Sequence, residues 1–483
     1  MGAASKRTVT LLQINDTHGY LEPHPELVWD GATPKFPTLG GYARIAAYFE
    51  RVRAERPGAV VALDNGDTFH GTHAAVASKG EALVPLTNAL GLDAMTAHWE
   101  FAWGPAHFQA LAARLDYPVL AINCYELESG RRPFAPSRVV ERGGLRIGIV
   151  GIAATIIDKT MPPHFSEGLR FTDGDKELPD EIRRLREDEG AKLVVVLSHL
   201  GLPQDIKLAG MVEGIDVVLS GHTHDRLERP IVANGAVIIQ SGCHGSFVGR
   251  LDLNIERGEV KVERHELVAM DDRIELDPKM HALVEGVVGP ARDKLAARVG
   301  HVDAALHRNT MLDCPMDDLL LAALCQASGR TIAFSNGWRY GAPVPPGPVS
   351  LNDLWNIIPV NPPVMTVTLT GAEIRTMMEQ NLRRTFSPDP FEQRGGYVKR
   401  FCGLTILAKI ENPVGYRVSE IFAGGAKLDP GASYDAAFVT AQGVPAQFGR
   451  DRRQTSVTAI EALQAYLENP QEGVAIPGRI VVF

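Results

Sequence analysis

The chain has 483 residues, 45% of them hydrophobic and 22% charged, which is the composition of a folded globular protein. Its 49 basic and 58 acidic residues leave a net charge of −9 without blocks of one sign, which excludes the basic footprint of a nucleic-acid-binding protein. No apolar run is long enough to span a membrane, so we expect neither a membrane nor a nucleic acid as a partner. The length favours two domains over a single core.

The N-terminal stretch "MGAASKRTVTLLQIND" runs directly into a strand-like segment, without an apolar signal core or twin arginines. As written, the sequence predicts a cytoplasmic protein, and a periplasmic one if an export signal has been trimmed. The five scattered cysteines form no CxxC motif. They indicate reduced, mostly buried thiols rather than a disulfide framework.

Between residue 8 and about residue 255, short apolar runs alternate with amphipathic segments. Helical periodicity predicts helices within 40–56 and 175–190. The apolar runs predict strands at 8–14, 59–65, 117–123, 145–152, 192–199, 216–222 and 236–242. This alternation predicts an α/β layered domain whose strands are buried on both faces.

The segment 277–300 predicts a helical connector, and the pattern changes after it. Further helices are expected at 315–328 and 370–382, and further strands at 331–336, 364–369, 404–410 and 434–440. The prolines of "RYGAPVPPGPVS" (339–350) predict a loop, because they disfavour both helix and sheet. We therefore expect a catalytic domain over 1–275, a connector over 276–300 and a second α/β domain over 301–483.

Polar side chains follow the predicted strands of the first half at their carboxyl ends, the edge where α/β sheets form ligand sites. The motifs "NDTHG", "GDTFHG", "TAHWE", "SHLG" and "GHTHD" place there Asp16, His18, Asp67, His98, His199, His222 and His224. Any one of these alone is more often a satisfied core or capping residue. Five ordered motifs at strand ends are not explained in that way, so we expect the seven side chains to converge.

The chemistry of these seven side chains favours a pair of divalent metal ions. Mixed oxygen and nitrogen ligands suit manganese, zinc, iron or cobalt better than calcium or magnesium. One carboxylate bridging two ions would hold them about 3.5–4 Å apart, and a hydroxide shared between the ions would be the nucleophile.

This ordered set resembles the calcineurin-like metallophosphoesterases, and among them the 5′-nucleotidase superfamily, over nearly the whole chain. The resemblance implies a layered αββα sandwich followed by a 5′-nucleotidase-type α/β domain that binds substrate. It also implies two metal ions, with manganese as the first choice. One ion would be held by Asp16, His18, Asp67 and His224, and the other by Asp67, His98, His199 and His222.

The stretch "TAHWE" departs from the family pattern Gly-Asn-His-Glu. Aligned without a gap, His98 stands at the position of the Asn ligand and Trp99 at that of the catalytic histidine. An imidazole can still coordinate a metal, but an indole cannot supply a proton. Loss of a general acid costs roughly 10²–10⁴-fold in rate for a sugar alkoxide. A thiol with a pKa near 8.5 leaves as an anion without help, so the change favours a sulfur leaving group.

Together with "SGCHGSFVGRLDL", "SNGWRYG" and "SPDPFEQRGGYVKR", the altered motif resembles the thiosulfohydrolase branch of the bacterial sulfur-oxidation system. That branch releases sulfate from a sulfone on a sulfur leaving group, including one held on a carrier protein. The resemblance makes Trp99, His98 and Arg339 candidate catalytic residues. The candidates for binding an anionic sulfone or phosphate ester are Arg339, Arg394, Tyr397 and His244. Lys399 and Arg400 remain open between that role and solvated surface charges.

Two other interpretations remain open. A 5′-nucleotidase or other phosphomonoesterase would need another residue to protonate the leaving group. The base-stacking Gly-Gly-Asp-Gly-aromatic loop of 5′-nucleotidases has no counterpart in "VTAQGVPAQFG", although Tyr397, Phe401 and Phe448 offer aromatic rings. A non-catalytic metal-binding protein is the third interpretation, but such a protein would be expected to have lost ligands.

Overall fold

The computed structural model describes residues 7–256, 259–312, 314–471 and 476–483. The chain forms two compact units. The first contains the N-terminal part up to Glu26 together with Pro37–Pro290, and the second contains Leu27–Phe36 together with Ala291–Phe483. The inclusion of residues 27–36 in the second unit has no sequence signal that we recognised. The predicted domain limits at 275 and 301 stay predictions.

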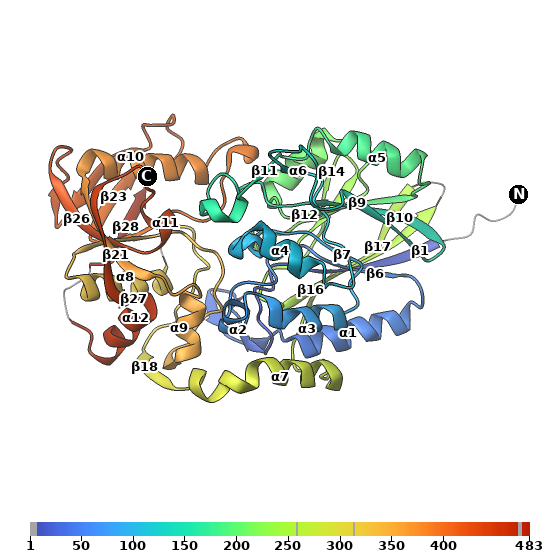
Figure 1. Cartoon of the computed structure of the whole chain (residues 1–483), viewed down its shortest axis with the longest axis horizontal. Coiled ribbons are helices and arrows are strands. Elements are labelled where there is room, and N and C mark those ends of the chain that lie inside the picture. The colour runs from blue at the N-terminus through green and yellow to red at the C-terminus, as the bar shows by residue number, and fades with distance from the viewer. Residues whose placement is uncertain (1–6, 257–258, 313, 472–475) are drawn as a thin grey trace, which may run out of the picture. The chain divides into compact units, whose positions relative to one another are not determined.

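The first unit is built on two sheets (Figure 1). The five-stranded sheet has the order β17-β16-β1-β6-β7, with β1 (Arg7–Ile14), β6 (Val60–Asp64), β7 (Ala94–Met95), β16 (Phe247–Glu256) and β17 (Glu259–Ala269). The six-stranded sheet has the order β14-β15-β13-β12-β10-β9, with β9 (Ser137–Arg142), β10 (Leu145–Ile152), β12 (Leu193–Ser198), β13 (Val217–Leu219), β14 (Ile231–Ala233) and β15 (Ala236–Ile239). In the five-stranded sheet β1, β6 and β7 run parallel, and β16 and β17 add an antiparallel pair on the other side of β1. In the six-stranded sheet β10, β12, β13 and β15 run parallel between the antiparallel edge strands β9 and β14.

The two sheets share one apolar core. Val9 and Leu63 of the first sheet pack in the same buried cluster as Ile147 and Val195 of the second. In Figure 1, α1 (Tyr42–Glu55) and α3 (Val84–Ala89) lie on one side of the sheets, and α5 (Leu178–Glu187) and α6 (Leu202–Met211) on the other. Strands covered on both faces must be apolar throughout, which explains the continuous Val, Ile and Leu runs. The predicted layered αββα fold is confirmed.

Two details of the first unit differ from the sequence-based expectation. The apolar run 117–123 is not a strand, because Val119 and Leu120 form only single bridges, with Met95 and Ala135 respectively. Pro118 lacks an N–H group, which prevents a regular ladder there. The long antiparallel pair β16 and β17 was not predicted, because its outer strand is polar and carries no clear apolar alternation.

Shorter elements complete this part of the chain. They are β2 (His24–Pro25), β3 (Val28–Asp30), β4 (Thr33–Lys35), β5 (Thr38–Leu39), β8 (Cys124–Glu126), β11 (Leu169–Phe171), α2 (His73–Ala77) and α4 (Pro105–Ala112), with 3-10 turns at Glu81–Leu83, Trp99–Trp103 and Pro163–Ser166. The predicted connector is α7 (Pro278–Leu295).

Besides the β3-β4 ribbon of residues 28–35, the second unit has a five-stranded sheet, a four-stranded sheet and a second two-stranded ribbon. Their orders are β22-β19-β26-β21-β27, β25-β24-β23-β28 and β18-β20. The strands are β18 (Arg298–Val302), β19 (Ile332–Ser335), β20 (Gly347–Ser350), β21 (Pro363–Thr370), β22 (Arg400–Cys402), β23 (Leu404–Ala408), β24 (Val418–Ala423), β25 (Ala426–Lys427), β26 (Ser433–Phe438), β27 (Arg450–Thr458) and β28 (Arg479–Val482). The helices are α8 (Pro315–Ser328), α9 (Leu351–Ile357), α10 (Gly371–Thr385), α11 (Thr440–Gly443) and α12 (Ala459–Glu468), with a 3-10 turn at Pro390–Glu392.

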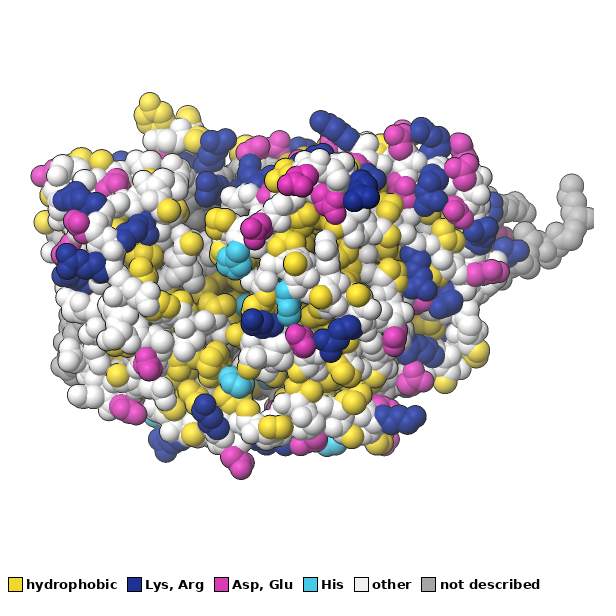
Figure 2. All heavy atoms as spheres, viewed as in Figure 1, with side chains coloured by type: hydrophobic (Ala, Val, Ile, Leu, Met, Phe, Trp, Pro, Cys, Tyr) yellow, Lys and Arg dark blue, Asp and Glu magenta, His cyan; other side chains and the backbone are white. Residues whose placement is uncertain are grey.

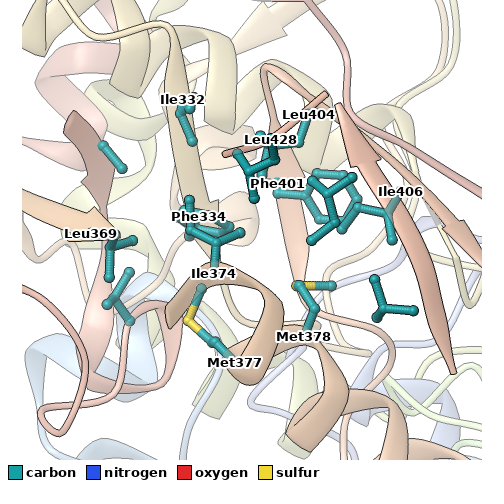
Figure 3. Close-up of a cluster of buried hydrophobic side chains, with 14 of the residues drawn as sticks. Ile332, Phe334, Leu369, Ile374, Met377, Met378, Phe401, Leu404, Ile406 and Leu428 are labelled. Carbon is teal, nitrogen blue, oxygen red and sulfur yellow. The ribbon is translucent and has the colours of Figure 1, made fainter. Parts of the chain in front are cut away.

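The core of the second unit forms where α10 meets the sheets (Figure 3). Helix α10 begins at a capping box, in which Thr370 and Glu373 satisfy each other's backbone N–H groups. Its buried face carries Ile374, Met377 and Met378, which pack toward Phe334 of β19. The helices and strands expected in this half are present.

One expectation for the second unit is wrong in part. The predicted loop 339–350 ends in the strand β20, which pairs only with β18. Pro348 is tolerated there because a two-stranded ribbon leaves one side of each strand without a partner.

The surface agrees with the charge pattern of the sequence. On the face seen in Figure 2, basic and acidic side chains are interspersed, without a continuous basic field. Within the described residues, no helix is long and apolar enough to cross a membrane.

Candidate metal centre

The seven predicted ligands come from loops at the carboxyl ends of five strands, β1, β6, β7, β12 and β13. Six of the seven are buried, and His224 is nearly so. The backbone is left-handed at five of them, with φ values between 49° and 75°: Asp16, His18, Asp67, His222 and His224. Such a conformation is costly for residues other than glycine, and its clustering in one place is typical of a functional site.

The side chains converge into two groups that share one carboxylate. Within each group, one ligand atom from every residue lies within 4.8 Å of the others. The groups are Asp67, His98, His199 and His222, and Asp16, His18, Asp67 and His224. The structure therefore brings together all seven residues, with Asp67 common to both groups.

Asp67 lies at the centre of the first group. Its Oδ1 is 3.1 Å from His98 Nδ1, and its Oδ2 is 3.3 Å from His199 Nε2. The His222 ring lies 4.9 Å from the His98 ring and 5.3 Å from the His199 ring. Three imidazoles thus surround one carboxylate.

Asp16 plays the corresponding part in the second group. Its Oδ1 is 3.3 Å from His224 Nε2, and its Oδ2 accepts a hydrogen bond of 2.9 Å from the His222 backbone. The Nε2 atoms of His18 and His224 are 3.3 Å apart. Two ring nitrogens at this distance either share a proton or bind the same cation.

Surrounding groups fix the orientation of these ligands. His199 Nδ1 contacts the Asn65 carbonyl at 2.7 Å, so its Nε2 faces the group. The Glu100 carboxylate accepts the backbone N–H of Thr68 and of His98, at 2.7 Å each, and so ties the loop of Asp67 to the loop of His98. Partners of this kind set the ring orientation of metal ligands.

The two buried carboxylates, Asp16 and Asp67, shift the pKa values of the side chains around them. Burial raises the pKa of Asp67, but His98 and His199 more than offset this and hold the pKa well below its usual range. Burial disfavours the charged His199, yet Asp67 and Asp16 raise its pKa to about 10. Burial lowers the pKa of His18 to about 3, so its imidazole is neutral, as a metal ligand must be.

The residues fit a pair of divalent ions. Two carboxylates and five imidazoles form the donor set, and the buried His98 Nε2 has no hydrogen-bond partner among the described residues. A buried polar atom without a partner is rare unless a ligand or water completes it. Divalent ions are a chemically matched occupant for such a donor set.

Trp99 lies beside this centre and is buried. Its backbone N–H donates to Asp67 Oδ1 at 2.8 Å. Its indole stacks on the His70 ring at 4.5 Å, and Phe165 packs edge-on against it at 5.6 Å. The indole is therefore a fixed apolar wall next to the shared carboxylate.

A third cluster adjoins the second group, and sequence reasoning found only one of its members. His244 lies 6.2 Å from both the His18 and the His224 rings, and its Nδ1 is 3.2 Å from Glu26 Oε2. Ser246 Oγ donates to the same carboxylate oxygen at 2.8 Å and is 3.1 Å from His24 Nε2.

Arg226 completes this cluster by donating to Glu26 Oε1 at 2.7 Å. These three donors orient the Glu26 carboxylate, which in turn holds His244 in place, and His24, Glu26 and His244 also lie close enough to one another to hold a metal ion. No motif in the sequence links Glu26 with His244, which is 218 residues away.

The predicted substrate residues of the second unit lie together in part. The Arg339 guanidinium is 5.4 Å from the centre of the Tyr397 ring and donates to the Gly396 carbonyl at 3.2 Å. Arg394 is partly exposed, with its guanidinium 3.9 Å from Glu392 Oε2. Arg339 and Tyr397 are therefore in contact with each other, whereas Arg394 pairs with Glu392.

Lys399 and Arg400 are not solvated surface charges. Lys399 is buried, and its Nζ donates to the carbonyls of Gln442 and Gly443. Arg400 is buried as well, with Nε 3.2 Å from Asp317 Oδ2 and with two bonds to backbone carbonyls. Their side chains serve the fold of the second unit through these contacts.

The aromatic side chains Phe401 and Phe448 belong to the apolar core. Both are buried members of the cluster around α10, of which Figure 3 labels Phe401. Of the three rings considered for base stacking, only Tyr397 is partly exposed.

Comparison with known families identifies the class. The calcineurin-like phosphoesterase family matches residues 9–226, and the 5′-nucleotidase C-terminal domain matches residues 288–440. The chain belongs to the metallophosphoesterases that carry this second domain, and it is a hydrolytic enzyme. The interpretation as a non-catalytic metal-binding protein is therefore wrong.

Two solved structures resemble the whole chain. The sulfate thiohydrolase SoxB of Thermus thermophilus, in complex with glycerol, matches with a TM-score of 0.88 and 25% identity, covering 98% of this chain and 96% of its own. A 5′-nucleotidase precursor, also from Thermus thermophilus, matches with a TM-score of 0.86 and 25% identity, covering 99% of each chain.

Curated relatives have nucleotidase names. The trifunctional nucleotide phosphoesterase protein YfkN of Bacillus subtilis is 24% identical over 86% of this chain, but the match spans only 30% of the relative. A 5′-nucleotidase of Diplobatis ommata is 24% identical over 87% of this chain and 78% of its own length. The comparisons therefore support a metal-dependent hydrolase, and the names of its relatives divide between thiohydrolase and nucleotidase.

Proposed function

We propose that this chain is a dinuclear metal hydrolase that releases sulfate from a sulfone bound to a sulfur leaving group. The observation that supports this most is Trp99, an indole at the position where the family resemblance places the proton-donating histidine. Its ring is stacked on His70 and buried, so it can shape the site but cannot protonate a leaving group.

The proposed metal ligands are the two groups that share Asp67. When bound, two divalent ions, manganese being our first choice, supply an activated water and neutralise charge that develops on the substrate. Asp67 belongs to both ligand groups and links them, and Glu100 fixes the loops that carry Asp67 and His98. Hydrogen bonds of this kind position the ligands before substrate binds, which is the arrangement that electrostatic catalysis requires.

The remaining residues bind the anionic substrate. We assign to the imidazolium form of His244 a hydrogen bond from Nε2 to a substrate oxygen that does not leave, because Glu26 accepts the Nδ1 proton and the ring adjoins the ligands His18 and His224. We assign to the Arg339 guanidinium the binding of the negatively charged sulfone, and the Tyr397 ring packs against this guanidinium. Arg394 is a weaker candidate, because Glu392 already balances its charge.

Phosphomonoester hydrolysis, as in a 5′-nucleotidase, is the second candidate. The observation that favours it is the pairing of Glu26 with His244, because the carboxylate stabilises the imidazolium, which is the form of this side chain that can protonate a leaving oxygen. The absent base-stacking loop and the buried Phe401 and Phe448 count against a nucleotide as the substrate.

Substrate and compartment are linked. A small phosphate ester is available in the cytoplasm. A carrier-protein thiosulfonate is available only to an exported enzyme. We propose a small or protein-bound thiosulfonate, without a nucleic acid or membrane partner.

A turnover comparison tests the proposal. The manganese-loaded protein is supplied with a small-molecule S-thiosulfonate, with p-nitrophenyl phosphate and with AMP, and the released sulfate and phosphate are quantified. We expect sulfate release, turnover of the activated aryl ester, and little hydrolysis of AMP. Rapid AMP hydrolysis without sulfate release would replace the first proposal by the second.

A further inference from the structure

Two cysteines of the second unit lie side by side in its core. Cys325, in the last turns of α8, and Cys402, the last residue of β22, have their Sγ atoms 3.2 Å apart. Both side chains are almost completely buried. Within the described part of the chain, this is the only contact between two thiol sulfurs that we find.

We propose that Cys325 and Cys402 are a modification site, at which a small disulfide oxidant of the glutathione class converts the two thiols into a disulfide. A bond of about 2.05 Å would require the sulfurs to approach by only about 1 Å. Sequence analysis predicted reduced thiols, and both are free in this structure. The pairing was not visible there because 77 positions separate the two residues.

The surrounding structure holds the two sulfurs together. Helix α8 packs against β22, and β22 is the edge strand of its sheet, paired with β19 at Ala333. Cys402 Sγ also contacts the Leu321 carbonyl at 3.9 Å, which is a weak partner. A bond would therefore tie the edge strand to the helix without displacing a strong interaction.

The reaction balances with two glutathione thiols as products. The thiolate of one cysteine attacks oxidised glutathione, forms a mixed disulfide and releases one glutathione thiol. The second cysteine attacks the protein-bound sulfur, closes the Cys325–Cys402 bond and releases the second glutathione thiol. The two thiol hydrogens of the protein end on glutathione. Because both sulfurs are buried, the first attack occurs while α8 is not yet packed on β22, that is, during folding or local opening.

Cys314 provides a matched control. It is a buried thiol of the same unit at the start of α8, and its Sγ donates to Asp317 Oδ2 at 3.0 Å. No other thiol lies in contact with it among the described residues. A general sensitivity of buried thiols to oxidant would affect Cys314 as well as the pair.

The test is refolding of the full chain in a buffer of oxidised and reduced glutathione, followed by unfolding, alkylation and peptide mapping. We expect the alkylatable thiols to fall from five to three, with the lost pair joined as one cross-linked peptide that contains Cys325 and Cys402. The melting temperature of the oxidised form should rise by on the order of 5–10 °C relative to the reduced form.

The rise in melting temperature should disappear in Cys402→Ala and persist in Cys314→Ala. Five alkylated thiols after refolding, or a cross-link that joins other cysteines, would overturn the proposal. Mapping of the unsubstituted chain decides the matter even if a variant does not fold. The inference does not depend on the proposed activity, since it concerns only the core of the second unit.

Discussion

Both units bury charged side chains, but they do so in different ways. In the first unit, Asp16 and Asp67 face five imidazoles, and the buried Nε2 of His98 lacks a partner among the described residues. In the second unit, Asp317 lies between Arg308 and Arg400, at 2.9 and 3.2 Å, and backbone carbonyls accept further guanidinium N–H groups. Each charge of the second cluster has an opposite charge beside it, although Arg400 Nε makes no hydrogen bond, whereas the first cluster turns several ring nitrogens toward one another.

This difference separates a binding site from a structural element. A buried ion cluster whose charges are paired with one another stabilises one arrangement and has no free charge left for a ligand. A cluster of mutually repelling donors on left-handed backbone is costly by itself and gains its stability from what it binds. The predictions below test that distinction.

The largest effect is expected for Asp67→Ala, because both ligand groups share this carboxylate. Turnover should fall by more than about 10⁴-fold, since the residues act as one unit. Metal analysis should show no more than one ion per chain, with the protein still folded. The exposed carboxylate Asp303 supplies the control, and Asp303→Ala should keep both metals and activity. Full metal content in Asp67→Ala would contradict the assignment.

Trp99→His should restore a proton donor at the altered motif. Hydrolysis of an alkyl phosphate should rise by about 10²–10⁴-fold, the usual contribution of a general acid, while sulfate release changes little. Trp99→Phe keeps an apolar ring and should change neither rate substantially. Equal changes on both substrates would show that Trp99 acts only through packing.

Asp317→Asn should reduce the free energy of unfolding without changing metal binding or catalysis. The substitution leaves two buried guanidiniums without a counter-charge, which costs about 3–5 kcal/mol. Chemical denaturation measures the loss, and Asp318→Asn is the neighbouring control. Loss of metal in Asp317→Asn under conditions where it is folded would remove the contrast between the two clusters.

His244→Asn should weaken substrate binding more than stability. Asparagine tolerates the left-handed backbone at this position, where φ is 59°, and can keep a hydrogen bond to Glu26. The value of kcat/KM should fall by about 10–100-fold, the usual worth of a hydrogen bond to a charged group. His24→Gln, in the same cluster but bonded to Ser246, should change kcat/KM little. Similar losses in both variants would indicate that the whole cluster is structural.

The smallest effect concerns Lys399. Burial lowers its pKa from 10.5 to about 7, so the unfolded chain binds more protons than the folded one between these values. The free energy of unfolding should therefore rise with pH across that window, by at most about 1.4 kcal/mol per pH unit. Lys399→Met should flatten this dependence, whereas Lys427→Met, at an exposed position, should not. An unchanged slope in Lys399→Met would show that another group is responsible.

Much of the metal centre was readable from the sequence, because its ligands follow apolar strands whose carboxyl ends meet at one edge. The contacts of side chains whose partners lie far away in the sequence could not be predicted. Glu26 acts through His244, and Cys325 meets Cys402 only after α8 packs on the sheet. The roles of Lys399 and Arg400 were also undecided, because exposure depends on tertiary packing. The prediction of a strand at 117–123 was wrong, because apolar composition alone does not reveal an interrupted hydrogen-bond ladder.

The central claim is that the site cannot protonate a leaving group and therefore acts on good leaving groups. The most direct measurement is the dependence of kcat/KM on leaving-group pKa, using a series of aryl and alkyl phosphates and thiosulfonates with the manganese-loaded protein. The account predicts a steep decline as the leaving-group pKa rises, and a shallower one in Trp99→His. A shallow dependence in the unsubstituted enzyme would contradict the account and point to a proton donor other than residue 99.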